Sequence, residues 1–90
     1  MLSTPASLLE RLRRPEPGQA WEQFVRMYTP LLCQWARRLG LQDHDVADLV
    51  QDVMVRLHQK LPEFVYDPAK SFRAWLRTVL INQWRNQRDK

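Results

Sequence analysis

Arginine, tryptophan and asparagine side chains are concentrated in residues 71–90. Five cations, one acid, two tryptophans and two asparagines share this segment: Arg73, Arg77, Arg85, Arg88, Lys90, Asp89, Trp75, Trp84, Asn82 and Asn86. Cations neutralise phosphate groups, aromatic rings stack on bases, and amide side chains can hydrogen-bond to base edges. The segment is therefore the strongest sign in this chain of a nucleic-acid partner.

On a helix of about 100° per residue, these side chains divide between two flanks. One group falls within about 60° and clear of the apolar side, and it comprises Arg73, Arg77, Trp84 and Arg88. This group could track phosphates while Trp84 stacks on an unpaired base, or it could be a solvated basic face with one packed tryptophan. Asn82 lies on another flank, where it could read adenine or be an exposed polar residue.

A second cluster of interest is acidic. Its members recur at three- and four-residue steps and are Asp45, Asp48 and Asp52. We place Leu49 and Val55 on the same water-facing side. An acid run can be only a solvated helix face, but apolar residues ringed by charge are typical of a protein interface. The cluster therefore indicates either a solvated surface or a docking site for another protein.

No pattern in the chain indicates catalysis or metal binding. His44 and His58 complete no ligand set with the aspartates, and no nucleophile motif accompanies them. Gly18 and Gly40 are the only glycines, which excludes a glycine-rich phosphate loop. Cys33 is the only cysteine, so an internal disulfide is excluded and a reducing compartment is favoured. We therefore predict a protein that is not an enzyme and that needs no metal or cofactor.

The formal net charge of +4 is distributed unevenly. Residues 1–40 hold six cations and three acids, residues 41–69 hold two cations and six acids, and residues 70–90 hold six cations and one acid. A basic segment suits phosphates and an acidic one suits a basic protein surface, so we expect two partners. No stretch approaches the roughly 20 apolar residues of a membrane span, and no signal peptide is evident. We expect a soluble intracellular protein.

The elements that must position these side chains are helical. Ninety residues, 44% of them apolar, suffice for one small domain, and two glycines with few β-branched runs favour helices over sheet. The spacing predicts an all-α bundle of three main helices plus a short N-terminal helix, over residues 6–14, 19–39, 43–61 and from 72 onward. Residues 1–18 are expected to form an N-terminal arm or short helix, and residues 19–90 the folded domain.

Local signals refine these helices. Pro30 predicts a kink or a junction between two helices, Gly40 a stop, and Asp43 or Asp45 a capped start. The apolar side of the helix expected over residues 43–61 should comprise Val46, Val50, Val53, Met54, Leu57 and Leu61. Two prolines bracket a loop over residues 62–70. Ser71 can then cap the final helix, whose core positions are Phe72, Trp75, Leu76, Val79 and Leu80.

Taken together, the motifs resemble region 2 of the extracytoplasmic-function (ECF) subfamily of sigma-70 family RNA polymerase sigma factors. The resemblance covers about residues 19–88. In chain order its motifs are WEQFV at 21–25, YTPLL at 28–32, DLVQDV at 48–53 followed by Arg56 and Leu57, then Phe64, and SFRAWLRTV at 71–79 followed by Asn82. The order and spacing of two separate motifs make the resemblance specific.

The resemblance implies a bacterial, cytoplasmic transcription initiation domain. It would bind the β′ clamp helices of core RNA polymerase and the promoter −10 element as a non-template single strand, with one base flipped into a pocket near the loop. The polymerase-binding residues would be Asp48, Leu49, Gln51, Asp52, Val55 and Arg56. The DNA-binding residues would be Phe64, Tyr66, Asp67, Lys70, Ser71, Phe72, Arg73, Arg77, Asn82 and Arg85. Trp84 and Arg88 join the DNA set from their helix positions alone.

The resemblance also implies a further partner, and the sequence departs from the family pattern at several positions. An anti-sigma factor is a candidate partner, and the isolated domain is expected to be a monomer. Met54 stands where many relatives have Phe, His58 stands where an aromatic residue is usual, and Trp84 has no counterpart. The chain stops at Lys90, before the linker and the helix-turn-helix region 4, so we expect a fragment.

Two other functions stay open at this point. The last helix could read duplex DNA as part of a helix-turn-helix regulator. The loop over residues 62–70 is longer than the roughly 3–4-residue turn of that motif, which weakens this alternative. The chain could instead be a helical protein–protein module whose basic helix only adds solubility.

Overall fold

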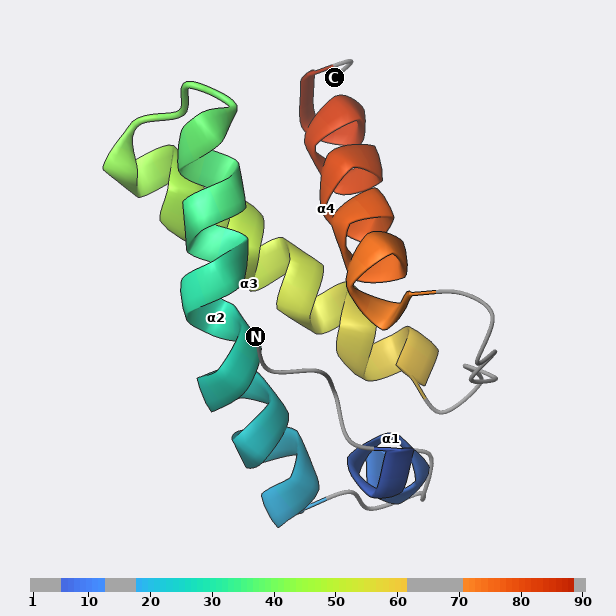
Figure 1. Cartoon of the computed structure of the whole chain (residues 1–90). Coiled ribbons are helices and arrows are strands. Elements are labelled where there is room, and N and C mark those ends of the chain that lie inside the picture. Colours follow the sequence, from blue (N-terminus) through green and yellow to red (C-terminus); the bar gives the residue numbers. More distant parts are fainter. Residues whose placement is uncertain (1–5, 13–17, 62–70, 89–90) are drawn as a thin grey trace.

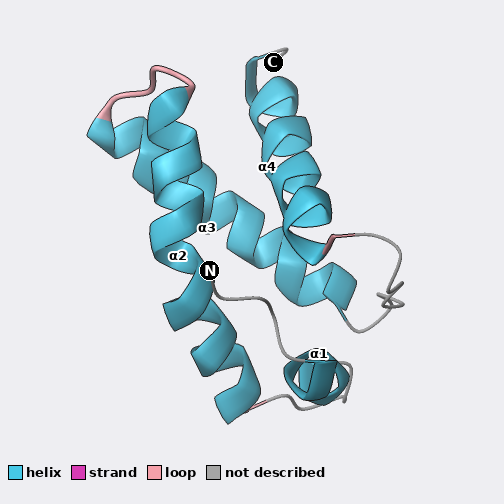
Figure 2. Cartoon of the chain, viewed as in Figure 1, coloured by secondary structure: helices cyan, strands magenta, loops and turns pink. Residues whose placement is uncertain are grey.

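Four helices make up the part of the chain that the structure describes. The computed structural model describes residues 6–12, 18–61 and 71–88. The helices are α1 (Ala6–Leu12), α2 (Gln19–Arg38), α3 (Asp43–Lys60) and α4 (Phe72–Arg88), and no strand occurs among these residues (Figure 1). Figure 2 shows the same all-helical composition. The predicted fold class, three long helices and one short one, is confirmed.

The helix α2 runs without interruption through Pro30, so the predicted alternative of two helices meeting there is wrong. Proline removes one N–H donor and leaves the carbonyl of Arg26 without its helical partner. Because Pro30 is exposed, water can bond to that carbonyl. Both halves of the helix are held to one core by side chains at four-residue steps, which are Ala20, Phe24, Tyr28, Leu32 and Ala36.

The ends of the helices follow the local sequence signals in most places. Gly40 adopts φ +86° just after α2, a left-handed conformation that glycine tolerates, so the predicted stop is confirmed. Ser71 caps α4, since its Oγ accepts a hydrogen bond from the Ala74 N–H at 3.2 Å. The N-cap of α3 is Gln42, without a side-chain cap bond. Asp43 therefore lies in the first turn, where the helix dipole favours a carboxylate, and it does not cap.

A shared apolar core joins all four helices. The short helix α1 contributes Leu8 and Leu12, which are both buried. At the centre, the ring centroids of Tyr28 lie 5.0 Å from Phe24 and 5.7 Å from Phe72. Burying a side chain of this size contributes about 1.5–3 kcal/mol. Phe72 is 6% exposed, so the side chain that was predicted both as core and as a DNA contact belongs to the core.

Leu49 corrects the prediction for the acidic helix. Its side chain is 0% exposed and packs in the core, whereas Val55 is 55% exposed as predicted. On the helical wheel Leu49 lies about 60° from Val46, on the same side as Val53. The sequence pattern therefore already contained the correct position, and our assignment of Leu49 to the water-facing side was wrong.

The helix α3 packs against both α2 and α4. In Figure 1 it crosses behind α2 and passes to α4, while α1 is seen end-on near the start of α2. One side of α3 therefore borders α2 and another borders α4. The residues that line these two sides form the candidate site.

Candidate functional site

A surface groove of about 350 Å³ lies between α3 and the first half of α2. Its lining is mainly apolar and consists of Trp21 and Val25 from α2 with Gln51, Met54, Val55, His58 and Gln59 from α3. We call this the α2–α3 groove. Among the large apolar side chains that the structure describes, Val55 is the one classed as exposed. An exposed valine beside a groove with apolar walls is an arrangement that suits protein binding.

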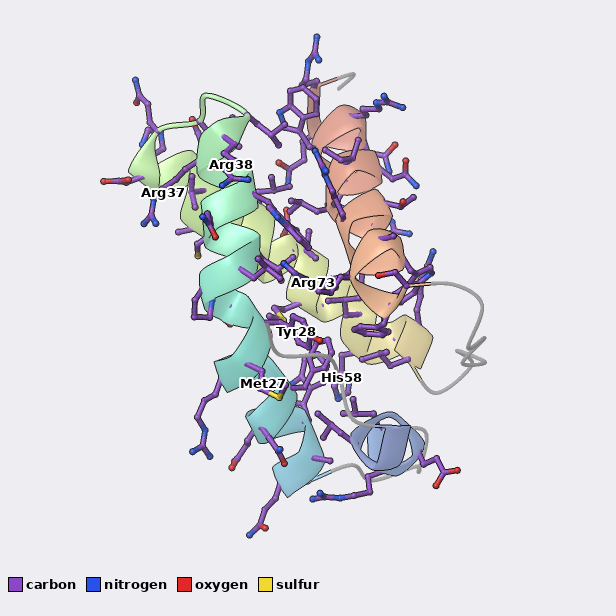
Figure 3. The ribbon with its side chains drawn as sticks, in the orientation of Figure 1. Met27, Tyr28, Arg37, Arg38, His58 and Arg73 are labelled. Carbon is purple, nitrogen blue, oxygen red and sulfur yellow. The ribbon has the colours of Figure 1, made fainter. Side chains whose placement is uncertain are left out.

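Aromatic contacts fix one wall of the α2–α3 groove. The indole of Trp21 stacks on the buried ring of Phe24, with centroids 5.5 Å apart and planes at 15°. The imidazole of His58 meets the same indole edge-on at 4.9 Å, and Figure 3 shows His58 beside the first half of α2. Such aromatic pairs add about 0.5–1.5 kcal/mol beyond burial, so the wall is well defined before any partner binds.

The six residues expected to bind polymerase do not share one surface. Gln51 and Val55 line the α2–α3 groove, and Asp48 is exposed one turn earlier on α3. Leu49 is buried. The remaining two, Asp52 and Arg56, contact α4.

Two side-chain hydrogen bonds join α3 to α4. The Arg56 Nε–H donates to Gln83 Oε1 at 3.1 Å, and the Gln87 amide donates to Asp52 Oδ2. Asp52 and Arg56 are four residues apart on α3, and Gln83 and Gln87 are four residues apart on α4. The earlier residue of α3 pairs with the later residue of α4. The two helices are therefore antiparallel along this side, and one helical turn separates the two bonds.

A second groove, of about 460 Å³, lies along the same side. We call it the α3–α4 groove, and it is lined by Arg56, Lys60, Val79, Asn82, Gln83, Arg85 and Asn86. Cations and amides dominate this lining, and none of its described residues carries a carboxylate. Two residues predicted to bind DNA, Asn82 and Arg85, lie here. Sequence reasoning did not assign Lys60 to any site, because its role depends on the packing of α3 against α4.

The other flank of α4 carries the predicted arginine face. The Arg73 guanidinium lies 6.0 Å from the centroid of the Trp35 ring, and the Arg88 guanidinium lies 4.7 Å from that of Trp84. Arg77 is exposed. Trp84 is half-buried and packs against the core, so the prediction that it lies among arginines instead of in the core is only half right. Arg88 covers part of its ring.

The remaining DNA-binding candidates lie at the start of α4 and before it. Ser71 caps the helix with its hydroxyl, and Phe72 is buried, with its ring centroid 5.5 Å from that of Trp75. Four candidates fall outside the described residues, namely Phe64, Tyr66, Asp67 and Lys70.

The Tyr28 hydroxyl is a titratable group buried between helices. Burial raises the pKa of the Tyr28 hydroxyl above 10.0, and the nearby Arg73 charge opposes this in part. The Tyr28 hydroxyl is buried and has no hydrogen-bond partner within the described part of the chain. Figure 3 shows Tyr28 and Arg73 close together between α2 and α4.

Residues 6–12, 18–61 and 71–88 contain no group of three or more His, Cys, Asp or Glu side chains that could hold a metal ion. None of the helices in those ranges is long and apolar enough to cross a membrane.

Comparison with known proteins identifies the family. The model of sigma-70 region 2 matches residues 24–90. RNA polymerase sigma factor CnrH from Cupriavidus metallidurans is 38% identical over 68 residues, which cover 76% of this chain and 35% of that protein. RNA polymerase sigma factor NccH from Alcaligenes xylosoxydans xylosoxydans is 36% identical over 78 residues, covering 84% of this chain and 41% of that protein. No solved structure matches the chain significantly.

The chain thus spans between a third and a half of the length of these curated relatives. The resemblance to ECF sigma factor region 2 that the sequence motifs indicated is confirmed by these matches. Sigma factors are not enzymes, which agrees with the prediction of a non-catalytic protein. On these grounds, the chain belongs to the sigma-70 region 2 family.

Proposed function

We propose that this chain is the part of a sigma factor that binds core RNA polymerase and the promoter −10 element during transcription initiation. The proposed binding to polymerase rests on one observation. Val55 is 55% exposed beside an apolar groove whose aromatic wall is already ordered. The cations and amides of α4 carry the DNA half.

The β′ clamp helices are the proposed occupant of the α2–α3 groove. Val55 supplies an apolar anchor, Gln51 supplies an amide that can hydrogen-bond at the edge, and Asp48 supplies a charge on the rim. An apolar centre with a polar rim is the usual anatomy of a protein interface, and a few central side chains carry most of its energy. Leu49 would support this surface from the core.

A single DNA strand is the proposed partner of α4 and the residues before it. Arg73, Arg77 and Arg85 would hold phosphates, and Asn82 would contact a base edge. The loop residues Phe64, Tyr66, Asp67 and Lys70 are proposed to receive an extruded base, whose stacking and edge contacts would offset the energy of unstacking. Polymerase binding would position the domain for this step.

A pull-down against a β′ clamp-helix fragment tests the polymerase half. We expect Val55→Asn to lower affinity by about tenfold or more, because hot-spot truncations cost about 2 kcal/mol or more. Ala74→Asn is the matched control, since it places the same amide at an exposed position of α4. We also expect Asp48→Ala and Gln51→Ala to weaken binding without unfolding the chain. Wild-type affinity in Val55→Asn and in both of these variants would remove the interface assignment.

Binding to labelled oligonucleotides tests the DNA half. We expect a −10-like single strand to bind more tightly than its duplex, with affinity falling as salt rises. Tighter duplex binding would favour the helix-turn-helix alternative instead. Capture of the clamp fragment without any oligonucleotide binding would leave only the protein-interaction role.

A further inference from the structure

The α3–α4 groove combines side chains from the helix assigned to polymerase with side chains from the helix assigned to DNA. The cations Arg56 and Lys60 come from α3, and Arg85 comes from α4. The amides of Asn82, Gln83 and Asn86 lie along the same groove. Grouped cations with amides between them suit a polyanion that also offers hydrogen-bonding edges, which is the chemistry of a nucleic-acid strand.

The orientation of Arg56 supports this reading. Its Nε–H donates to Gln83 Oε1 at 3.1 Å, so the guanidinium is held toward α4 and away from the α2–α3 groove. The two Nη groups carry four more N–H donors, and a guanidinium binds a phosphate through such paired donors. Gln83 therefore orients the Arg56 guanidinium within the groove that both residues line.

Lys60 extends the same cationic line. It follows Arg56 by four residues on α3, which is about 6 Å along the helix axis. Asp52 precedes Arg56 by the same step, and its carboxylate accepts a hydrogen bond from the Gln87 amide. The Asp52 carboxylate is therefore engaged with α4, and the α3 side chains in the described lining of the groove are the cations Arg56 and Lys60.

We infer that Arg56 and Lys60 belong to the DNA site and bind phosphates of the strand whose bases meet Asn82 and Asn86. This inference rests on the proposed DNA-binding function and adds residues of α3 to it. It also reassigns Arg56, which the family resemblance had placed among the polymerase contacts. The α3–α4 groove is then a strand-binding channel in which Arg56, Lys60 and Arg85 hold phosphates, while Asn82 and Asn86 contact bases.

Fluorescence anisotropy with a labelled −10-like single strand tests this inference over a series of salt concentrations. The chain is measured alone and with saturating β′ clamp fragment. We expect Lys60→Gln and Arg56→Gln each to weaken binding and to reduce the slope of log affinity against log salt by about 0.7, the value for one lost phosphate contact on a single strand. Asn86→Ala should change base preference and leave that slope unchanged.

Arg26→Gln is the matched control, because it removes one charge from an exposed position of α2 outside the groove. It should keep the wild-type slope. Arg56→Gln should also retain wild-type affinity for the clamp fragment. Denaturation curves of each variant establish that the fold is retained.

The outcomes separate this inference from the proposed function. A wild-type chain that binds the strand, together with an unchanged salt slope in Lys60→Gln and Arg56→Gln, would overturn the groove assignment and leave the proposed function standing. Loss of clamp affinity in Arg56→Gln without loss of DNA affinity would return Arg56 to the polymerase surface and contradict the inference. A wild-type chain that binds no strand in either state would contradict both.

Discussion

The two grooves that flank α3 differ in chemistry although their α3 residues are neighbours in sequence. Residues 51, 55 and 59 line the α2–α3 groove, and residues 56 and 60 line the α3–α4 groove. A shift of one residue turns a side chain by about 100° around the helix. The first groove is mainly apolar with aromatic walls, and the second is lined by cations and amides. One helix can therefore face a protein on one side and a nucleic acid on the other.

This difference shows why the acidic cluster should not be treated as a single surface. Asp48 is exposed near the apolar groove, whereas Asp52 accepts a hydrogen bond from Gln87 of α4. Net charge along a segment gives the sign of its long-range field, but the packing of neighbouring helices decides which charges a partner can reach.

The largest expected effect tests the boundary between the apolar groove and the core. Leu49→Ala should lower the free energy of unfolding by about 2–5 kcal/mol, because it leaves a cavity under α3. Val55→Ala, six residues later on the same helix, should change it by less than about 0.5 kcal/mol. Urea denaturation followed by circular dichroism measures both. Similar losses for the two variants would mean that the groove and the core are not distinct.

A smaller effect is expected at Trp84, on the flank of α4 away from the α3–α4 groove. Trp84→Ala should cost about 2 kcal/mol, below the roughly 3–5 kcal/mol of a fully buried tryptophan, because the ring is only half-buried. Arg88→Ala should cost about 0.5–1 kcal/mol through loss of the cation–π contact. Thermal unfolding of both variants checks these values.

Single-strand binding by Trp84→Ala tests whether this flank of α4 also contacts DNA. If a base stacks on Trp84, Trp84→Ala should also lower single-strand affinity, since such stacking contributes about 1–3 kcal/mol per base. Trp84→Phe, which keeps an aromatic ring, serves as its control. Unchanged affinity in Trp84→Ala would restrict this side chain to packing and would leave strand binding to the α3–α4 groove.

The smallest effect concerns Tyr28, which lines neither groove. Its buried hydroxyl has no partner among the described residues, so Tyr28→Phe should be neutral or stabilise the fold by up to about 1 kcal/mol. Clamp and strand affinities should not change.

Tyr28→Phe should also change how the free energy of unfolding depends on pH in alkaline solution. The pKa of Tyr28 in the folded state is raised above 10.0. The stability that comes from keeping its hydroxyl protonated is therefore fully present below pH 10.0 and is lost as the pH rises through the folded-state pKa. The difference between the wild-type and Tyr28→Phe unfolding free energies should therefore vary with pH only above about 10. A pH-independent difference would show that Tyr28 ionises equally in both states.

Much of the fold followed from local patterns. Apolar residues at three- and four-residue steps from Trp21 to Leu39 predict α2, and Gly40 and Ser71 act at the helix ends as expected. Pro30 misled the prediction of a junction, because a proline on an exposed face can be tolerated when both halves pack on one core. The error at Leu49 was one of assignment, since its wheel position already favoured burial.

The site was less accessible from sequence. The pairs Arg56–Gln83 and Asp52–Gln87 join residues 27 and 35 positions apart, and only the register between α3 and α4 brings them together. The half-burial of Trp84 likewise depends on packing against the core. A helical wheel gives the direction of a side chain but not the helix that it meets.

The most direct test of the account measures two variants against both partners. Val55→Asn and Lys60→Gln are each titrated with the β′ clamp fragment and with the −10-like single strand. We predict a crossed result: Val55→Asn loses clamp affinity by about tenfold or more and keeps strand affinity, while Lys60→Gln loses strand affinity and keeps clamp affinity. If each folded variant weakened both partners equally, or neither, the division of α3 into a protein-binding side and a nucleic-acid-binding side would be contradicted.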